Sequence, residues 1–131
     1  MKLLLDTHVW LWSLLEPNRL AAKVRRRLET GADSLWLSPI SVWEACLLAE
    51  RGRLELDRPA AAWVDAALQA APVRDAPLTR QVAVESRSVV LRHDDPADRF
   101  LAASALVHGL TLVTADRRLL AARRVPTLSA R

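Results

Sequence analysis

The chain has little of several features that define other classes of protein. It contains one cysteine, Cys46, so no disulfide can form within it, and we expect a reducing, cytoplasmic compartment. No apolar run reaches the roughly 18 residues that a membrane-spanning helix needs. The first residues are interrupted by Asp6 and His8 before a secretory apolar segment could form. We therefore expect no membrane segment.

Glycine and lysine are also scarce, and two classes of phosphate chemistry are disfavoured as a result. With three glycines the chain has no Gly-rich loop of the nucleotide-binding type. An aspartyl-phosphate phosphotransfer domain would use Asp6 as its nucleophile, with a lysine at a late strand end. Both lysines, Lys2 and Lys23, come early, and Thr7-His8 follows Asp6 where a second aspartate two positions on would be needed.

What is present fits one domain over residues 1–131, with 51% hydrophobic and 26% charged residues. Short apolar strands alternate with helices, and this predicts a three-layer α/β/α sandwich around a parallel sheet of four to five strands. We expect strands at 2–5, 34–37, 72–75 (the weakest pattern), 110–114 and 125–128, and helices at 8–15, 18–28, 39–51, 59–71, 79–91, 95–108 and 116–123.

Acidic residues stand where two predicted strands end. Asp6 and Asp116 follow the strands at 2–5 and 110–114, and ligand sites in parallel sheets lie beyond the carboxyl ends of the strands. Taken singly, each could instead cap the helix that follows it. Asp98, three residues after Asp95, could likewise serve only the start of its helix.

Glu44 and Asp98 are harder to explain as structural residues. Glu44 shares a helix face with Leu47 and Leu48, and an unpaired buried carboxylate costs several kcal/mol. Arg51 is the available ion-pair partner in a structural interpretation. Asp98 also lies among apolar neighbours on its helix.

Taken together, the four acids predict a metal site. Four carboxylates in one cleft raise one another's pKa unless a positive charge holds them. A hard divalent cation with oxygen ligands is the usual solution. We therefore expect Asp6, Glu44, Asp98 and Asp116 to hold a metal ion in an enzyme.

The charge balance is consistent with a polyanionic substrate. The net charge is +4 and 17 of the 19 basic residues are arginine. If the four site acids among the 15 acidic residues are set aside, 19 basic residues face 11 acidic ones. A basic body around an acidic pocket suits nucleic acid, although an arginine-rich surface can also reflect genome composition.

Four segments carry a family resemblance. They are LLLDTHVW (3–10), SPISVWE (38–44), HDDPADRFLAASA (93–105) and LVTADRRL (112–119), in order and at suitable spacing. With them the chain resembles PIN-domain proteins of the VapC toxin type over nearly its whole length. The resemblance implies a PIN-like fold and an endoribonuclease that depends on Mg²⁺ or Mn²⁺ and hydrolyses RNA, acting as the toxin of a toxin–antitoxin pair.

The resemblance also implies roles for individual residues. The family's acidic quartet carries over onto Asp6, Glu44, Asp98 and Asp116, and Thr114 matches a hydroxyl position that would steady a metal-bound water. The run Asp94-Asp95 departs from the family, which more often has a basic residue there. The choice among Asp94, Asp95 and Asp98 is therefore open, and Asp98 fits best.

Partners follow from the same resemblance. It implies an antitoxin protein that blocks the cleft, and a homodimer, for which the apolar segments 8–15 and 43–48 could supply an interface. A catalytically inert module that only binds RNA or a partner is the remaining alternative.

A few further residues stand around the predicted cleft. Arg99 is the first candidate to counter the charge of a substrate phosphate. Asp95 could join the site or cap its helix before Pro96. His93 lies near the predicted cleft and could contact substrate, although the three histidines show no metal-ligand spacing. The five tryptophans fit core or interface packing better than base stacking.

Overall fold

The centre of the molecule is a five-stranded parallel sheet in the order β3-β2-β1-β4-β5. The structure is a computed structural model that describes residues 1–131. Its strands are β1 (Lys2–Leu5), β2 (Ser34–Leu37), β3 (Arg74–Asp75), β4 (Thr111–Thr114) and β5 (Thr127–Ser129). Leu4 of β1 pairs with Trp36 of β2 on one side and with Leu112 of β4 on the other. The central strand is thus paired on both edges, and its apolar sequence follows because Leu3, Leu4 and Leu5 are buried on its two faces.

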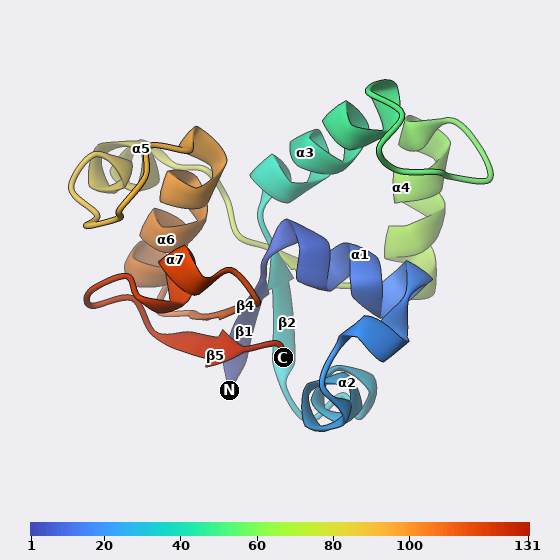
Figure 1. Cartoon of the computed structure of the whole chain (residues 1–131), viewed down its shortest axis with the longest axis horizontal. Coiled ribbons are helices and arrows are strands. Elements are labelled where there is room, and N and C mark those ends of the chain that lie inside the picture. The colour runs from blue at the N-terminus through green and yellow to red at the C-terminus, as the bar shows by residue number, and fades with distance from the viewer.

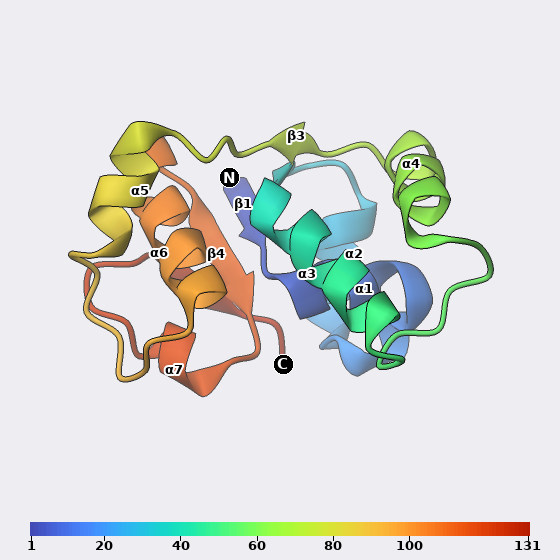
Figure 2. The same ribbon diagram turned by 90° about the horizontal axis from the view of Figure 1, so that it is seen from above.

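Helices cover both faces of this sheet (Figures 1 and 2). They are α1 (Thr7–Leu15), α2 (Ala22–Glu29), α3 (Pro39–Glu50), α4 (Ala60–Ala70), α5 (Arg80–Ser86), α6 (Pro96–His108) and α7 (Arg117–Leu120), with a 3₁₀ turn, η1, at Pro17–Arg19. In Figure 1, α1, α2 and α4 lie to the right of the strands and α5, α6 and α7 to the left. None of the α-helices is long and apolar enough to cross a membrane.

The alternation of side chains along β1 divides the core in two. Leu3 and Leu5 point into one cluster of buried residues, together with Val9, Trp10 and Trp63 of the α1 and α4 layer. Leu4 points into the other cluster, which is built mainly from α6 and β4. Two cores on opposite faces of one sheet confirm the three-layer α/β/α sandwich with a parallel sheet.

The helix α3 lies where the two layers meet. It contacts α1, α4 and α6, and its Ile40 packs against the α6 core while Val42 and Leu48 pack against the other. Ser38 caps its first turn by accepting a hydrogen bond from Ile40 N at 3.1 Å. Because α3 begins directly after β2, its amino-terminal half is brought to the carboxyl end of the sheet (Figure 1).

Two predicted helices end or break earlier than their sequence pattern indicates. The helix expected over 18–28 is interrupted at Leu20 and Ala21, whose backbone is extended because Ala21 N donates to Ala130 O at 2.9 Å. The helix expected to reach residue 91 stops at Ser86. The helix expected over 116–123 is also shorter, since α7 covers only Arg117–Leu120. Of the strand expected at 72–75, only Arg74 and Asp75 pair with β2.

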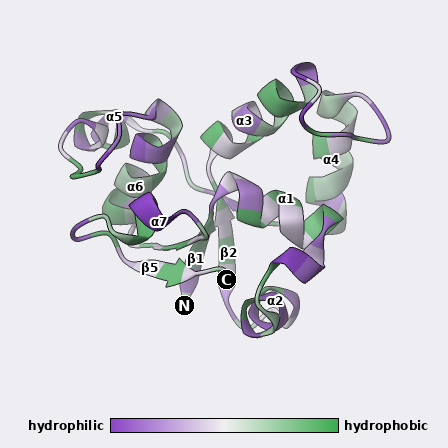
Figure 3. Ribbon diagram, viewed as in Figure 1, coloured by the Kyte–Doolittle hydropathy of each residue, from purple (hydrophilic) through white to green (hydrophobic).

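Hydropathy along the ribbon follows the same plan (Figure 3). The connection between α3 and α4 and the beginning of α7 are hydrophilic, and these segments carry arginine and glutamate on the surface. Three large apolar side chains on or next to the helices remain more than half exposed, namely Trp43 at 55%, Val84 at 71% and Val90 at 53%. These exposed side chains are the ones available to a partner.

Candidate active site

Two of the predicted acids stand side by side at the carboxyl ends of neighbouring strands. Asp6 follows β1 directly, and Asp116 comes two residues after β4. The two strands are paired in parallel, and Asp6 N donates to Val113 O at 3.0 Å. The parallel pairing therefore brings together residues that are far apart in sequence.

Thr114 connects these two aspartates. Its hydroxyl donates to Asp6 Oδ2 at 2.7 Å and accepts from Asp116 N at 3.0 Å. The other oxygen of Asp6 accepts from Thr7 N at 2.7 Å, so both oxygens of this carboxylate are fixed. The family resemblance implies that Thr114 steadies a metal-bound water. Its side chain is fully buried, and the hydroxyl is committed to the two aspartates instead.

Glu44 reaches the same end of the sheet from α3. Its Oε1 accepts a hydrogen bond of 2.5 Å from the Thr7 hydroxyl, and Thr7 Oγ1 lies 2.9 Å from Ser41 Oγ. Arg51, the ion-pair partner expected in a structural interpretation, forms the carboxyl-terminal cap of α3 and makes no ion pair with Glu44. The carboxylate is therefore held by the Thr7 hydroxyl and not by a cation.

Asp98 enters from the first turn of α6. Its Oδ2 lies 2.7 Å from His93 Nε2, while the buried His93 Nδ1 has no hydrogen-bond partner. Asp95 caps the helix by accepting from Asp98 N at 3.2 Å. The Asp94 side chain is 83% exposed and lies 3.7 Å from Arg99. Of the three acids in this run, Asp98 is thus the one that is itself largely covered and held by a short side-chain hydrogen bond.

Asp116 is the most solvated of the four. It caps α7, where its Oδ1 accepts from Arg118 N at 2.8 Å and its Oδ2 lies 3.4 Å from the Arg118 guanidinium. Burial acts to raise the pKa of Asp116, but the hydrogen bonds and charge of Arg118 outweigh it and hold the pKa below its usual range. The side-chain cap expected from the sequence is present.

The other three acids have raised pKa values, chiefly because they are buried. Burial raises the pKa of Asp6 despite its hydrogen bonds from Thr114 and Thr7. Burial raises the pKa of Glu44 to about 7, with repulsion from Asp6, Asp98 and Asp95 adding to it. Burial also raises the pKa of Asp98 and outweighs the hydrogen bond with His93, which lowers it. Repulsion from Asp95, Asp6 and Asp116 raises this pKa further. These shared repulsions place the acids in one electrostatic environment that is short of positive charge.

The donor chemistry of this environment fits a divalent cation. Carboxylate oxygens are the ligands that Mg²⁺ and Mn²⁺ prefer. Glu44 Oε2 and Asp98 Oδ1 receive no hydrogen bond from the protein. No three His, Cys, Asp or Glu side chains lie close enough to hold a metal ion in their present conformations. The acids thus gather at one end of the sheet without forming a closed metal cage.

Arg99 does not have the position that the sequence suggested. Its side chain is 8% exposed, and its guanidinium donates to Ser86 O at 2.8 Å and Val89 O at 2.9 Å. These carbonyl groups lie at and just beyond the end of α5. Arg99 therefore closes α5 and anchors the following loop, and the expectation that it counters substrate phosphate is wrong.

Thr7 and Ser41 are the site residues that sequence reasoning missed. Both carry a weak signal, since each is a polar residue within the first turn or so of an otherwise apolar helix next to a site acid. His93 was expected near the cleft as a group that contacts substrate, but its pairing with Asp98 was not. It precedes Asp98 by five residues across a turn, a spacing that belongs to no helical pattern.

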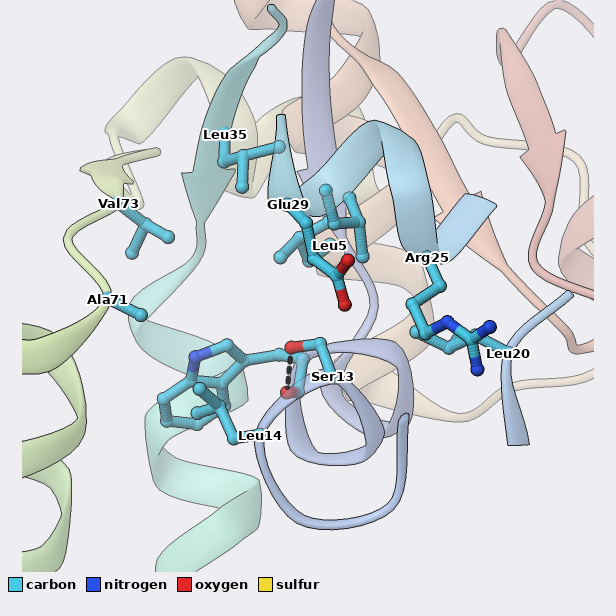
Figure 4. A pocket seen from close by; sticks show the side chains of 11 residues that line it. Leu5, Ser13, Leu14, Leu20, Arg25, Glu29, Leu35, Ala71 and Val73 are labelled. Carbon is cyan, nitrogen blue, oxygen red and sulfur yellow. Dashed lines mark hydrogen bonds between the residues drawn. The ribbon is translucent and has the colours of Figure 1, made fainter. Parts of the chain in front are cut away.

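Two hollows help to locate the site. Asp6 and Asp116 line a pocket of about 360 Å³ together with His8, Trp12, Arg19, Ala115 and Arg131. A separate pocket of about 300 Å³ lies beside α1, α2 and β2 and is lined mainly by apolar side chains, with Arg25 and Glu29 among its polar residues (Figure 4). It contains none of the four acids. The hollow beside Asp6 and Asp116 therefore marks one side of the candidate active site, and Glu44 and Asp98 lie outside both hollows.

The sequence of this chain is similar to those of known proteins. The PIN domain family matches residues 3–125. Ribonuclease VapC22 of Mycobacterium tuberculosis (strain ATCC 25618 / H37Rv) is 38% identical over 117 residues, which are 88% of each chain.

Solved structures show the same fold. A chain of VapBC2 from Rickettsia felis, bound to a DNA fragment from its promoter, superposes with a TM-score of 0.73 at 14% identity over 98% of both chains. A chain of DNA-bound VapBC from Salmonella typhimurium has a TM-score of 0.72 at 20% identity over 100% of this chain and 99% of that one. These findings confirm the resemblance read from the sequence, and the chain belongs to the PIN-domain family as a relative of the VapC ribonucleases.

Proposed function

We propose that this protein is a divalent-metal-dependent endoribonuclease and the toxin of a toxin–antitoxin pair. The observation that carries the proposal is the set of acids at the carboxyl end of the sheet, three of which have raised pKa values chiefly because of burial. Family membership and the VapC22 relative support the same conclusion. A module that only binds RNA would have no need to keep three carboxylates that are buried or partly buried and repel one another.

Asp6, Glu44, Asp98 and Asp116 are the residues that would hold Mg²⁺ or Mn²⁺. When bound, such an ion supplies a Lewis acid that polarises the phosphodiester and activates water for attack. The chain contributes the positions of the ligands. Thr114 orients Asp6, Thr7 orients Glu44 and His93 orients Asp98, each through a hydrogen bond of 2.5 to 2.7 Å.

Cleavage of purified RNA tests the proposal. The wild-type protein should cleave total RNA with Mg²⁺ or Mn²⁺ and stop when a chelator is added. Asp6→Asn and Asp98→Asn should each lower the cleavage rate by at least about 100-fold while the protein stays folded by circular dichroism. Asp65→Asn, on the exposed surface of α4, is the matched control and should cleave normally. Full activity in either site variant would refute the assignment.

An antitoxin is proposed as the second partner. The structures of similar fold come from VapBC toxin–antitoxin complexes, and an arginine of an inhibitor could pair with the Glu44 and Asp98 carboxylates at the carboxyl end of the sheet. Co-expression with the product of the neighbouring reading frame should give a stable complex that no longer cleaves RNA.

We also propose a homodimer, with an interface that keeps part of the two segments first expected, 8–15 and 43–48. Within 8–15, Val9, Trp10 and Leu11 are buried in the core. Within 43–48, Trp43 on α3 is exposed, and a second copy could cover it together with Val84 on α5, which lies outside both segments. Sedimentation at micromolar concentration should show a dimer, and Trp43→Ser together with Val84→Ser should shift it to monomer. A wild-type monomer at these concentrations would contradict this.

A further inference from the structure

A cluster of two arginines and a tryptophan lies beside the candidate active site. The Arg19 guanidinium carbon is 4.6 Å from the centroid of the Trp12 ring, and that of Arg131 is 4.9 Å from it. Arg131 Nε also donates to the Arg19 backbone oxygen at 3.2 Å. The ring of His8 is tilted against Trp12 with its centroid 5.8 Å away. The end of α1, η1 and the last residue are thus joined through one aromatic ring.

The two arginines of this cluster differ in their ion pairs. Arg19 forms an exposed ion pair with Glu16 at 3.2 Å, whereas Arg131 has no carboxylate partner. The terminal nitrogens of the Arg131 guanidinium have no hydrogen-bond acceptor in the protein, because only its Nε donates, to the Arg19 backbone. They are therefore free to bind an anion.

The location of the cluster connects it with the acids. Arg19, Arg131 and Trp12 line the same 360 Å³ pocket as Asp6 and Asp116. A neighbouring groove of about 440 Å³ shares His8, Trp12 and Arg19 and is also lined by Arg53, beyond the end of α3. A strand that runs from one hollow into the other would therefore pass Trp12 and Arg19.

We propose that Trp12, Arg19 and Arg131 form a subsite for the phosphate backbone of single-stranded RNA next to the bond that is cleaved. This inference rests on the proposed nuclease function. Guanidinium groups bind phosphate oxygens through two parallel hydrogen bonds. Because stacking on Trp12 already restricts the arginine side chains, they lose less conformational entropy when they bind. Because the acids repel RNA in the absence of a cation, the affinity for substrate has to come from neighbouring positive charge. An acidic protein segment is the other polyanion that could bind here, but the shared pocket with the acids favours RNA.

Binding can be separated from cleavage by working in chelator. The affinity of a fluorescein-labelled single-stranded 12-mer RNA is measured by anisotropy between 50 and 200 mM KCl. The double variant Arg19→Gln/Arg131→Gln should bind about tenfold more weakly, and the slope of log affinity against log salt should fall by roughly 1.4, or about 0.7 for each phosphate that is no longer neutralised. Arg26→Gln/Arg80→Gln removes the same charge from exposed positions on α2 and α5 that line none of these hollows.

Each outcome decides the question. Weaker binding and a smaller salt slope in the pocket variant, with the control unchanged, supports the subsite. Equal weakening in both variants would mean that only net charge matters and would overturn it. Unchanged RNA affinity together with reduced affinity for a poly-glutamate peptide would assign the cluster to a protein partner and also overturn it. RNA cleavage by the wild-type protein with Mg²⁺ tests the nuclease function independently, so failure of the subsite leaves that function standing.

Discussion

Replacing Glu44 by glutamine should stabilise the metal-free protein at neutral and alkaline pH. The pKa of Glu44 rises from 4.5 to about 7 in the folded state, mainly because the carboxyl is buried. Between these two values the folded state keeps a proton that the unfolded state has released. The free energy of unfolding therefore falls as pH rises from about 4.5 to 7, and the loss is complete above the folded pKa. Glutamine cannot ionise, so the variant avoids this loss.

The size of the effect follows from the pKa change and the exposure of the group. For a fully buried carboxyl the change corresponds to about 3 kcal/mol. Since Glu44 is only partly buried, solvent screening reduces this to roughly 1 to 2 kcal/mol at pH 8. The melting temperature of a domain of this size should rise by about 3 to 8 °C. Near pH 4.5 the two proteins should be almost equally stable, because glutamine can still accept the hydrogen bond from Thr7.

Urea unfolding in the presence of chelator at pH 4.5, 6, 7 and 8 measures the difference directly. Glu50→Gln, at the exposed end of the same helix, is the matched control and should show no comparable pH-dependent gain. If Glu44→Gln is no more stable than the wild type at pH 8, or if its advantage does not grow between pH 4.5 and 8, then the Glu44 carboxylate carries no net penalty in the folded protein and the reasoning is refuted.

Three further predictions concern the groups around the acids. Thr114→Val removes the hydroxyl shared by Asp6 and Asp116. The variant should lose about 1 to 2 kcal/mol of stability and cleave RNA roughly 10- to 100-fold more slowly. Unchanged cleavage kinetics would argue against the positioning role of Thr114. Arg99→Gln leaves the carbonyls at the end of α5 without their donor and should lower stability by about 2 kcal/mol; calorimetry checks this, and Arg92→Gln on the nearby surface is the control. Millimolar Mg²⁺ should raise the melting temperature of the wild type by binding only the folded state, and the shift should be absent in Asp6→Asn if the acids hold the ion.

The strands and the acids at their ends were accessible to sequence reasoning because they depend on local patterns. Short apolar runs predicted β1, β2 and β4, and parallel topology then placed Asp6 and Asp116 together. The apolar neighbours of Glu44 and Asp98 indicated that these carboxylates face inward, and both are partly buried. The three-layer architecture followed from the same alternation of elements.

The features that the sequence did not reveal depend on contacts between distant elements. Thr7 holds Glu44 only because α3 packs against α1. The break at Leu20 and Ala21 depends on a hydrogen bond to Ala130 near the other end of the chain. Arg99 is charged and stands one residue from a site acid, yet its buried guanidinium serves the backbone of a different helix. In each case the partner is far away in sequence, and no local pattern specifies it.

The hydrogen bond from Thr114 to Asp6 spans 108 residues, and this separation has a consequence for folding. Asp6 receives the Thr114 hydroxyl only after β4 has paired with β1. A chain that stops before β4 lacks both Thr114 and Asp116, so it can fold a part of the sheet but cannot complete the centre.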